Sequence, residues 1–281
     1  MKVIKKVSDM QKIAFKHLMN EDEIGLVPTM GALHEGHVSL INKSVREDDI
    51  TVVSIFVNPT QFGPNEDYLK YPRPFDRDLK ICKANHVDYV FAPSAQEMYG
   101  QNHKTFVEVK DMQDILCGQF RKKHFRGVAT VVSKLFNITF CERAYFGVKD
   151  FQQLKIIEKM VKDLNFRTKI VPCPIVREKS GLALSSRNSY LSETEKKQAA
   201  AISKALKEAK EEFKNKSISQ VVNTAVRKIK GIAGSRIDYA QILDYDTLET
   251  AGKDTRKAVF VVAVWVGKTR LIDNIMIKKK E

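Results

Sequence analysis

The sequence contains no long hydrophobic run. Its longest uninterrupted apolar stretch, residues 258–266, has nine members, whereas a helix that crosses a membrane needs about 20. Met1 is not followed by an apolar segment of the kind found in secretory signals. We therefore expect a protein that is neither secreted nor embedded in a membrane.

Cysteine is also scarce, and its distribution argues against a C-x-x-C redox site and against a zinc site. The 281 residues include 4 cysteines, with no C-x-x-C pair and no Cys/His spacing typical of a zinc site. They are Cys82, Cys117, Cys141 and Cys173. Widely separated, reduced thiols indicate a cytoplasmic protein.

Three familiar motifs are missing. The sequence has no G-x-x-x-x-G-K-[ST] phosphate loop, no G-x-G-x-x-G after its first strand and no G-x-S-x-G nucleophile turn. These absences argue against a P-loop kinase, a dinucleotide-binding enzyme and a serine hydrolase of the α/β type.

Acidic residues are outnumbered, 34 against 48 basic ones, which leaves a net charge of +14. Such an excess would suit a nucleic-acid-binding protein. However, the lysines are mixed with acids, only residues 277–280 form a short basic run, and no basic stripe interleaved with aromatics occurs. We expect a solvated surface, partly serving an anionic substrate such as a nucleoside triphosphate, and no nucleic-acid partner.

The order of strands and helices predicts two domains. Strand-like and helical segments alternate up to about residue 177, with residues 50–57 (ITVVSIFV) typical of a parallel strand buried on both faces. Lysine-rich amphipathic helices and an antiparallel hairpin follow. We predict an α/β domain over 1–177, a Rossmann-like parallel sheet with helices on both faces, and a smaller α+β domain over 178–281. A short strand at 106–109 and a basic loop at 117–127 are also expected.

Residues 25–41, GLVPTMGALHEGHVSLI, change from strand to helix in their middle. His34 and His37 are three positions apart and therefore share a face of the predicted helix, while Gly31 and Gly36 leave backbone room for a ligand. A helix N-terminus with two imidazoles is a plausible phosphate site. Two surface histidines, or half of a zinc site, remain alternatives.

Other polar residues follow predicted strands. Gln61 lies just after residues 50–57, where ligands bind in open α/β sheets, although a turn residue bonded to its own backbone is the commoner case. Lys149 stands at a strand–helix junction and could reach phosphate or simply be exposed. Ser185, Ser186 and Arg187 form a second anion-binding loop. Two such elements fit an enzyme that reacts ATP at its α-phosphate.

Five ordered motifs between residues 28 and 193 carry a resemblance to a known family. They are PTMGALHEGH, VSIFVNPTQFGPNEDYLKYPR, HFRGVATVV, FGVKDFQQL and IVREKSGLALSSRNSYLS. The chain resembles the pantoate–β-alanine ligases, in the nucleotidylyl-transferase superfamily of HIGH-motif proteins. His34 and His37 correspond to the HIGH-type pair, and Ser185 to Asn188 take the place of the KMSKS-type loop.

The resemblance implies an activity and its partners. The family condenses pantoate with β-alanine, using ATP and Mg²⁺, through a pantoyl adenylate; it yields pantothenate, AMP and pyrophosphate on the route to coenzyme A. Its members are typically cytoplasmic homodimers.

The resemblance also implies residue roles. Gln61 is expected to bind pantoate and β-alanine, Gln153 pantoate, and Asp76 and Asp78 the Mg²⁺ ion. The catalytic residues are expected to be His34, His37, Lys149, Ser186 and Arg187, with His37 as proton donor. The expected ATP ligands are Met30, Gly31, Ala32, Leu33, His34, Glu35, Gly36, His37, Gly147, Val148, Lys149, Asp150, Val176, Leu184, Ser185, Ser186 and Arg187.

The sequence departs from the family pattern in places. Lys122 and Lys123 replace a usual Pro-Gly, Ser180 and Leu184 stand where Asp and Met are common, and Arg77 separates the two metal candidates. Two rivals remain: a nucleotidylyl transferase with another acceptor, and a basic nucleic-acid-binding protein that retains only the fold. The complete VNPTQFG and FGVKDFQQL motifs favour the ligase.

Overall fold

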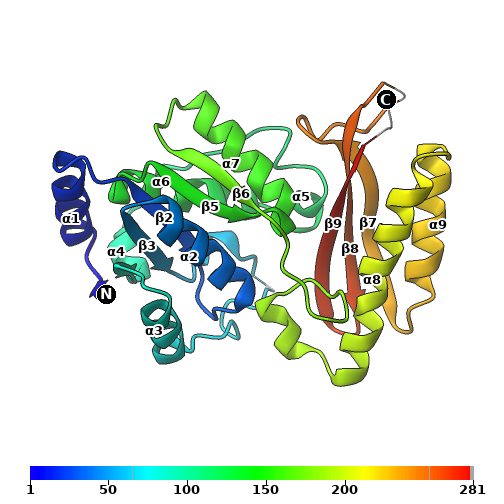
Figure 1. Cartoon of the computed structure of the whole chain (residues 1–281), viewed down its shortest axis with the longest axis horizontal. Coiled ribbons are helices and arrows are strands. Elements are labelled where there is room, and N and C mark those ends of the chain that lie inside the picture. The colour runs from blue at the N-terminus through cyan, green and yellow to red at the C-terminus, as the bar shows by residue number, and fades with distance from the viewer. Residues whose placement is uncertain (65, 253, 279–281) are drawn as a thin grey trace. The chain divides into compact units, whose positions relative to one another are not determined.

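The structure is a computed structural model that describes residues 1–64, 66–252 and 254–278 (Figure 1). The chain folds into two compact units, one formed by Met1–Val148 with Ile156–Pro174 and the other by Lys149–Lys155 with Ile175–Glu281. Lys149 and Gln153 thus belong to the second unit, whereas the sequence grouped them with the first. Residues 279 and 280 of the basic run lie outside the described residues. Among the described helices, none is long and apolar enough to span a membrane.

The first unit is built on a six-stranded sheet in the order β1-β4-β3-β2-β5-β6, with every neighbouring pair parallel. The strands are β1 (Lys2–Ile4), β2 (Ile24–Thr29), β3 (Ile50–Ile55), β4 (Tyr89–Phe91), β5 (Arg143–Gly147) and β6 (Lys169–Cys173). The chain direction across the sheet reverses between β2 and β5, and in such sheets ligands bind beyond the carboxyl ends of the strands at this point. The predicted parallel α/β fold is confirmed.

Helices cover both faces of this sheet (Figure 1). On one face, Leu40 and Ile41 of α2 (Glu35–Glu47) and Cys82 of α3 (Phe75–Ala84) pack with strand residues such as Val27. The alternate strand residue Leu26 is fully buried, and α6 (His124–Thr139) contacts β2, with α1 (Val7–Met19) against α6. The remaining helical segments are η1 (Pro59–Gln61), α4 (Ala95–Tyr99), α5 (Cys117–Phe120), η2 (Val148–Asp150) and α7 (Phe151–Asp163).

Two local predictions in the first unit were wrong. Residues 106–109 are not a strand; Val107 N–H donates to Thr130 Oγ1 of α6 at 3.0 Å, so this backbone bonds to a helix side chain rather than to a strand. The predicted loop 117–127 contains α5, and α6 already begins at His124.

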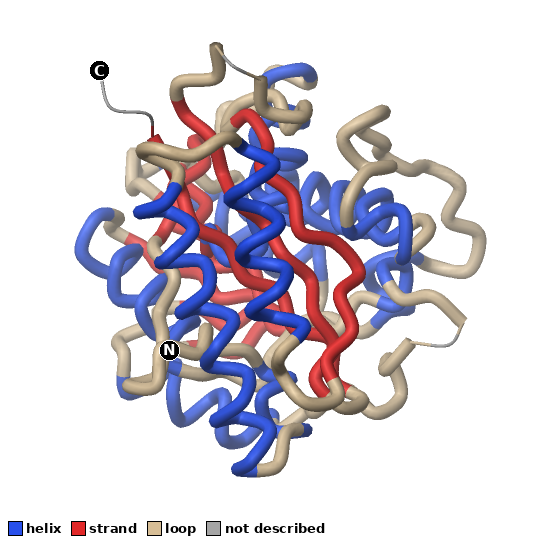
Figure 2. The backbone as a smooth tube through the Cα atoms, turned by 90° about the vertical axis from the view of Figure 1, so that its right-hand side faces the viewer, coloured by secondary structure: helices blue, strands red, loops and turns tan. Residues whose placement is uncertain are grey.

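The second unit contains a three-stranded antiparallel sheet in the order β7-β8-β9, with long helices packed along it (Figure 2). Besides the parts of η2 and α7 that belong to it, its elements are η3 (Ser186–Tyr190), α8 (Glu193–Glu212), α9 (Ile218–Lys230), β7 (Ser235–Asp244), β8 (Lys257–Val266) and β9 (Thr269–Lys278). Ser192 and Ser217 each form a capping box that starts the following helix. The predicted α+β composition of this region is confirmed.

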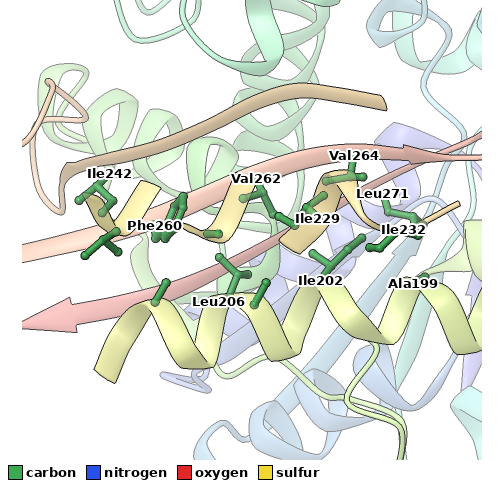
Figure 3. Packing of buried hydrophobic residues seen from close by; sticks show 14 of the residues in the cluster. Ala199, Ile202, Leu206, Ile229, Ile232, Ile242, Phe260, Val262, Val264 and Leu271 are labelled. Carbon is green, nitrogen blue, oxygen red and sulfur yellow. The ribbon is translucent and has the colours of Figure 1, made fainter. Parts of the chain in front are cut away.

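The core of the second unit lies between the helices and the sheet (Figure 3). Ile202 and Leu206 of α8 and Ile229 of α9 pack with Phe260 and Val262 of β8, and all five are at most 3% exposed. Burying side chains of this size contributes roughly 1.5–3 kcal/mol each. The unit therefore has its own hydrophobic core to support the loops it carries.

Candidate active site

The connection between β2 and α2 is a left-handed turn that demands glycine at one position. Gly31 has φ +80°, and a Cβ there would lie 3.0 Å from Asp78 Oδ2 and 3.1 Å from Ile55 Cγ2. Ala32 also has a positive φ, 51°. Because L-residues rarely adopt this conformation, other contacts must hold the turn in place.

Asp78 of α3 supplies those contacts. Ala32 N–H donates to Asp78 Oδ2 and Leu33 N–H to Asp78 Oδ1, both at 2.8 Å. Asp78 is 1% exposed. Burial raises the pKa of its carboxyl, while the bonds from Leu33 and Ala32 and the charge of Arg77 act in the opposite direction. The carboxylate thus fixes the histidine turn, residues 30–37, from a distant segment.

His34 and His37 cap the helix and each other's backbone. His34 is the N-cap of α2, and its Nδ1 accepts the N–H of Gly36 at 3.1 Å, while His37 Nδ1 accepts the N–H of His34 at 3.3 Å. The ring centroids are 4.1 Å apart. Since each Nδ1 accepts a hydrogen bond, each ring carries a proton at Nε2 and is neutral. The Nε2–H groups are therefore hydrogen-bond donors.

The zinc alternative lacks ligands. The part of the chain that the structure describes contains no group of three or more His, Cys, Asp or Glu side chains placed to hold a metal ion. Each Nδ1 of the histidine pair is also engaged by a backbone N–H. The pair is thus arranged as a helix cap in which both Nδ1 atoms accept backbone N–H groups.

Gln61 lies beyond β3 with its amide engaged by side chains. Asn58 Nδ2 donates to Gln61 Oε1 at 3.1 Å, and Gln61 Nε2 contacts Met30 Sδ at 3.0 Å. Gln61 is 8% exposed. The amide is therefore not used to bond its own backbone, and it adjoins the first residue of the histidine turn.

The backbone around Gln61 is held by the start of α6. A Cβ at Gly127 would lie 2.4 Å from the carbonyl oxygen of Thr60, so only glycine allows this approach. The Gly127 carbonyl accepts a hydrogen bond from Asn58 Nδ2 at 3.1 Å, and His124 Nδ1 donates to the Gln61 carbonyl at 2.8 Å. The sequence did not single out these three supporting residues, although each lies within a quoted motif.

Arg121 adds charge to this support. Its Nε donates to both carboxylate oxygens of Glu66 at 3.1 Å, its Nη1 lies 3.0 Å from His124 Nε2, and its Nη2 donates to the Gln61 carbonyl at 3.4 Å. The guanidinium also pairs closely with Glu66 through Nη2. The segment after Gln61 is thereby tied to the α5–α6 connection.

In the second unit, Lys149 lies in η2 with its backbone fixed from afar. Its carbonyl accepts a hydrogen bond from Asn274 Nδ2 of β9 at 2.9 Å. Lys149 Nζ is 3.8 Å from Asp150 Oδ2, and the lysine side chain is only 18% exposed. This is more enclosed than a freely solvated surface lysine, and Gln153 follows on α7, half-buried.

The serine loop, residues 184–188, is shaped by a small hairpin. Leu184 N–H donates to the Val176 carbonyl at 3.0 Å, so these two predicted ATP ligands are joined by a backbone hydrogen bond. Ser185 Oγ accepts the N–H of Arg187 at 3.3 Å and caps η3. Asn188 Nδ2 donates to the Ala183 carbonyl at 3.1 Å. These hydrogen bonds fix the backbone of the loop that contains Ser186 and Arg187.

The predicted site residues therefore fall into two groups. The first unit brings together the histidine turn and Gln61, with Gly147 and Val148 at the end of β5 beside β2. The second unit contains Lys149 to Gln153, Val176 and the serine loop.

The two metal candidates do not face each other. Asp76 and Asp78 are two residues apart on α3, and residues at that spacing project from different sides of a helix. Asp76 is exposed, whereas Asp78 is buried with both oxygens bonded to backbone N–H groups. That the pair ligates Mg²⁺ stays a prediction.

Comparison with known proteins decides the family. The pattern of the family described as pantoate-beta-alanine ligase matches residues 2–276. The chain belongs to the pantoate–β-alanine ligase family. It is 69% identical over 279 residues to the pantothenate synthetase of Endomicrobium trichonymphae, covering 99% of both chains, and 51% identical over 282 residues to that of Caldicellulosiruptor bescii, covering 100% of both. The predicted family and ligase activity are confirmed.

Solved structures agree with this membership. The crystal structure of pantoate-beta-alanine ligase (pantothenate synthetase) from Thermus thermophilus matches with a TM-score of 0.93 and 39% identity, covering 98% of this chain and 99% of that one. The Francisella tularensis ligase, complexed with beta-gamma ATP and β-alanine, matches with a TM-score of 0.81 and 37% identity, covering 98% and 97%. In that complex an ATP compound and β-alanine are bound to a ligase of this family.

Proposed function

We propose that this ligase condenses pantoate with β-alanine through a pantoyl adenylate, with release of pyrophosphate and AMP, as a step of pantothenate and coenzyme A biosynthesis. The contact of Gln61 Nε2 with Met30 Sδ carries the proposal, because it puts a buried amide beside the histidine turn. An amide both donates and accepts hydrogen bonds, which suits a substrate with hydroxyl and carboxylate groups. We assign Gln61 to pantoate and β-alanine and Gln153 to pantoate.

ATP contacts are proposed for both groups of residues. In the first unit the Nε2–H groups of His34 and His37 donate to phosphate oxygens, and in the second unit Lys149, Ser186 and Arg187 do so. The proposed ligands are residues 30–37, 147–150, 176 and 184–187.

The first step joins pantoate to the α-phosphate. A carboxylate oxygen of pantoate attacks the α-phosphorus in line, the bond from that phosphorus to the bridging oxygen breaks, and pyrophosphate leaves with the electron pair. The negative charge that develops is offset by the imidazole donors and by Lys149 and Arg187. We assign the donor role in this step to His37: its Nε2–H donates a hydrogen bond to the charge that develops, and the two bond changes need no proton transfer from the ring.

The second step forms the amide bond. The amine of β-alanine attacks the acyl carbon of the pantoyl adenylate, the bond to the phosphate oxygen breaks, and AMP leaves while the amine loses a proton. Gln61 holds the incoming amine next to the bound pantoyl group. We propose that β-alanine reacts as its neutral amine.

Mg²⁺ fits this chain as a companion of ATP rather than as a resident ion. Asp76 and Asp78 diverge on α3, and both oxygens of Asp78 already accept backbone N–H groups. Mg²⁺ commonly keeps several waters and uses substrate phosphates with only one or two carboxylates. We propose that it enters with the triphosphate, and the steps above require no protein carboxylate on the metal.

Assembly and location remain proposals from family membership. We propose a cytoplasmic homodimer, which light scattering at micromolar concentration tests directly. A monomer at that concentration would refute the dimer without affecting the chemistry, because each chain carries both groups of site residues.

Pyrophosphate exchange tests the order of the two steps. Exchange of labelled pyrophosphate into ATP should require pantoate and Mg²⁺ but not β-alanine, and AMP should accumulate only after the amine is added. Exchange supported equally well by β-alanine alone would contradict the adenylate, and a different acid replacing pantoate at equal rate would indicate another acceptor.

A further inference from the structure

One of the two edge strands of the sheet in the second unit, β9, contains two adjacent buried polar residues. β9 lies at the edge of the three-stranded sheet, and its Asp273 and Asn274 are each 6% exposed. Nearby positions of the strand, Leu271 and Ile277, belong to the hydrophobic core. Burying a carboxylate and an amide is unfavourable unless both are hydrogen bonded. Their partners therefore indicate what the two side chains do.

Asn274 holds the backbone of Lys149. Its Nδ2 donates to the Lys149 carbonyl at 2.9 Å, across 125 positions of sequence. Lys149 lies in η2, which has three residues and thus little internal hydrogen bonding of its own. The bond from β9 consequently restrains the peptide from which the lysine side chain extends.

Asp273 holds, through Arg177, the small hairpin that carries the serine loop. Arg177 Nη1 donates to Asp273 Oδ2 at 2.7 Å and Nη2 to Oδ1 at 2.8 Å, a two-pronged pair. Arg177 Nη1 also donates to the Gly181 carbonyl at 3.0 Å, and Arg177 forms a β-bridge with Ala183. The bridge is continued by the bond between Leu184 and Val176, so the arginine links β9 to the hairpin that carries the serine loop.

Adjacent residues of a strand project to opposite faces, so Asp273 and Asn274 can reach two different segments. We propose that Asn274 and the Arg177–Asp273 pair are positioning residues that keep Lys149 and the serine loop at a fixed separation. The cations Lys149 and Arg187 then act as one rigid phosphate site. This inference rests on the proposed function, which assigns phosphate contacts to these two cations.

A double-mutant cycle tests the link to Lys149. Asn274→Ala should slow pantoate-dependent pyrophosphate exchange about 10-fold, since small displacements of a catalytic group have large effects on rate. Pantoate affinity should be unchanged. If Asn274 acts through Lys149, the double variant Lys149→Ala/Asn274→Ala should be no slower than Lys149→Ala alone, because residues that act as a unit are not additive. Multiplying losses would overturn the inference.

A matched control removes an asparagine that touches neither segment. Asn223 is exposed on α9 of the same unit, and Asn223→Ala should leave the exchange rate and the unfolding temperature unchanged. An Asn274→Ala enzyme with wild-type exchange would also overturn the proposal.

Asp273→Asn tests the second link. This change keeps the shape of the side chain but weakens its pairing with Arg177, and its effect on exchange should vanish in an Arg187→Ala background. If the variant does not fold, the Asn274 cycle decides alone. A wild-type protein without pantoate-dependent exchange overturns the proposed function together with this inference, whereas an active wild type with additive variants overturns this inference only.

Discussion

The two groups of phosphate-binding candidates are built in opposite ways. The histidine turn of the first unit is short-range: His34 and His37 cap the same helix end, and the distant Asp78 only secures the turn before it. In the second unit, Lys149 and the serine loop come from separate segments and are joined through β9. The first group is thus encoded by neighbours in sequence, and the second depends on the complete fold.

This difference has consequences for substitution. A residue of the histidine turn has two roles, capping and donation, so its replacement combines both losses. A cation of the second unit has one role, and its position depends on side chains elsewhere. The two kinds of site can therefore be separated by variants that retain one role and remove the other.

The largest effect is expected at the histidine pair. His37→Ala removes a helix cap and a donor, and adenylation should fall by about 10²–10³-fold, the scale of losing one preorganised donor. Pantoate affinity should change little. His37→Gln supplies an acceptor for the His34 N–H, as in an ordinary capping box, and should recover stability more than rate. Measurement of exchange rates and unfolding temperatures for both variants separates the roles; equal rates for His37→Ala and wild type would remove His37 from the chemistry.

Removing a cation of the second unit should lower the rate of adenylation without changing the stability of the fold. Lys149→Ala or Arg187→Ala should lower adenylation by about 10²-fold, with an unchanged unfolding temperature because neither side chain belongs to the core. The exposed Lys230 at the end of α9 offers a control, and Lys230→Ala should change neither the adenylation rate nor the unfolding temperature. Unchanged exchange in Lys149→Ala and Arg187→Ala would make both ordinary surface cations.

Replacing either glutamine should weaken the binding of pantoate rather than the binding of ATP. Gln61→Ala or Gln153→Ala should raise the pantoate dissociation constant about tenfold to hundredfold, since a lost hydrogen bond to a charged group is worth roughly 1.5–3 kcal/mol. ATP binding measured without pantoate should barely move. Calorimetry of each variant against each ligand checks this, and a Gln61→Ala protein that loses ATP but keeps pantoate would invalidate the proposed assignment.

The smallest effect concerns the loop that supports Gln61. Lys123 has φ +65° at the N-cap of α6, in a position where the resemblance to the family leads us to expect glycine. A left-handed L-residue costs roughly 1–2 kcal/mol, so Lys123→Gly should increase the free energy of unfolding by about 1 kcal/mol. Lys122, outside the residues with positive φ, is the matched control: Lys122→Gly should not stabilise. Denaturant titration of the two variants provides the comparison.

The histidine turn could be recognised from sequence because its determinants are close together. A short apolar run, a glycine, and two histidines three positions apart predict a strand that turns into a helix, and local sterics and hydrogen bonds then set the left-handed turn and the helix cap that the structure shows. The strand predicted for residues 106–109 was wrong because the partner of this segment is distant in sequence. Their apolar pattern matches a strand, but the decisive partner, Thr130 of α6, lies elsewhere in the chain.

The sequence by itself determined the strand–helix alternation, the α/β and α+β composition of the two regions and the family, while the roles of the site residues stay predictions. Only the tertiary structure decided that Asp78 secures the turn rather than facing Asp76, that Asn58, His124 and Gly127 hold Gln61, and that Asn274 reaches Lys149. Periodicity reports which face of an element is apolar, but it carries no information on which distant polar group will satisfy a buried amide or carboxylate. That pairing is selected when the elements pack, because each buried polar group must then find a partner among whatever lies beside it.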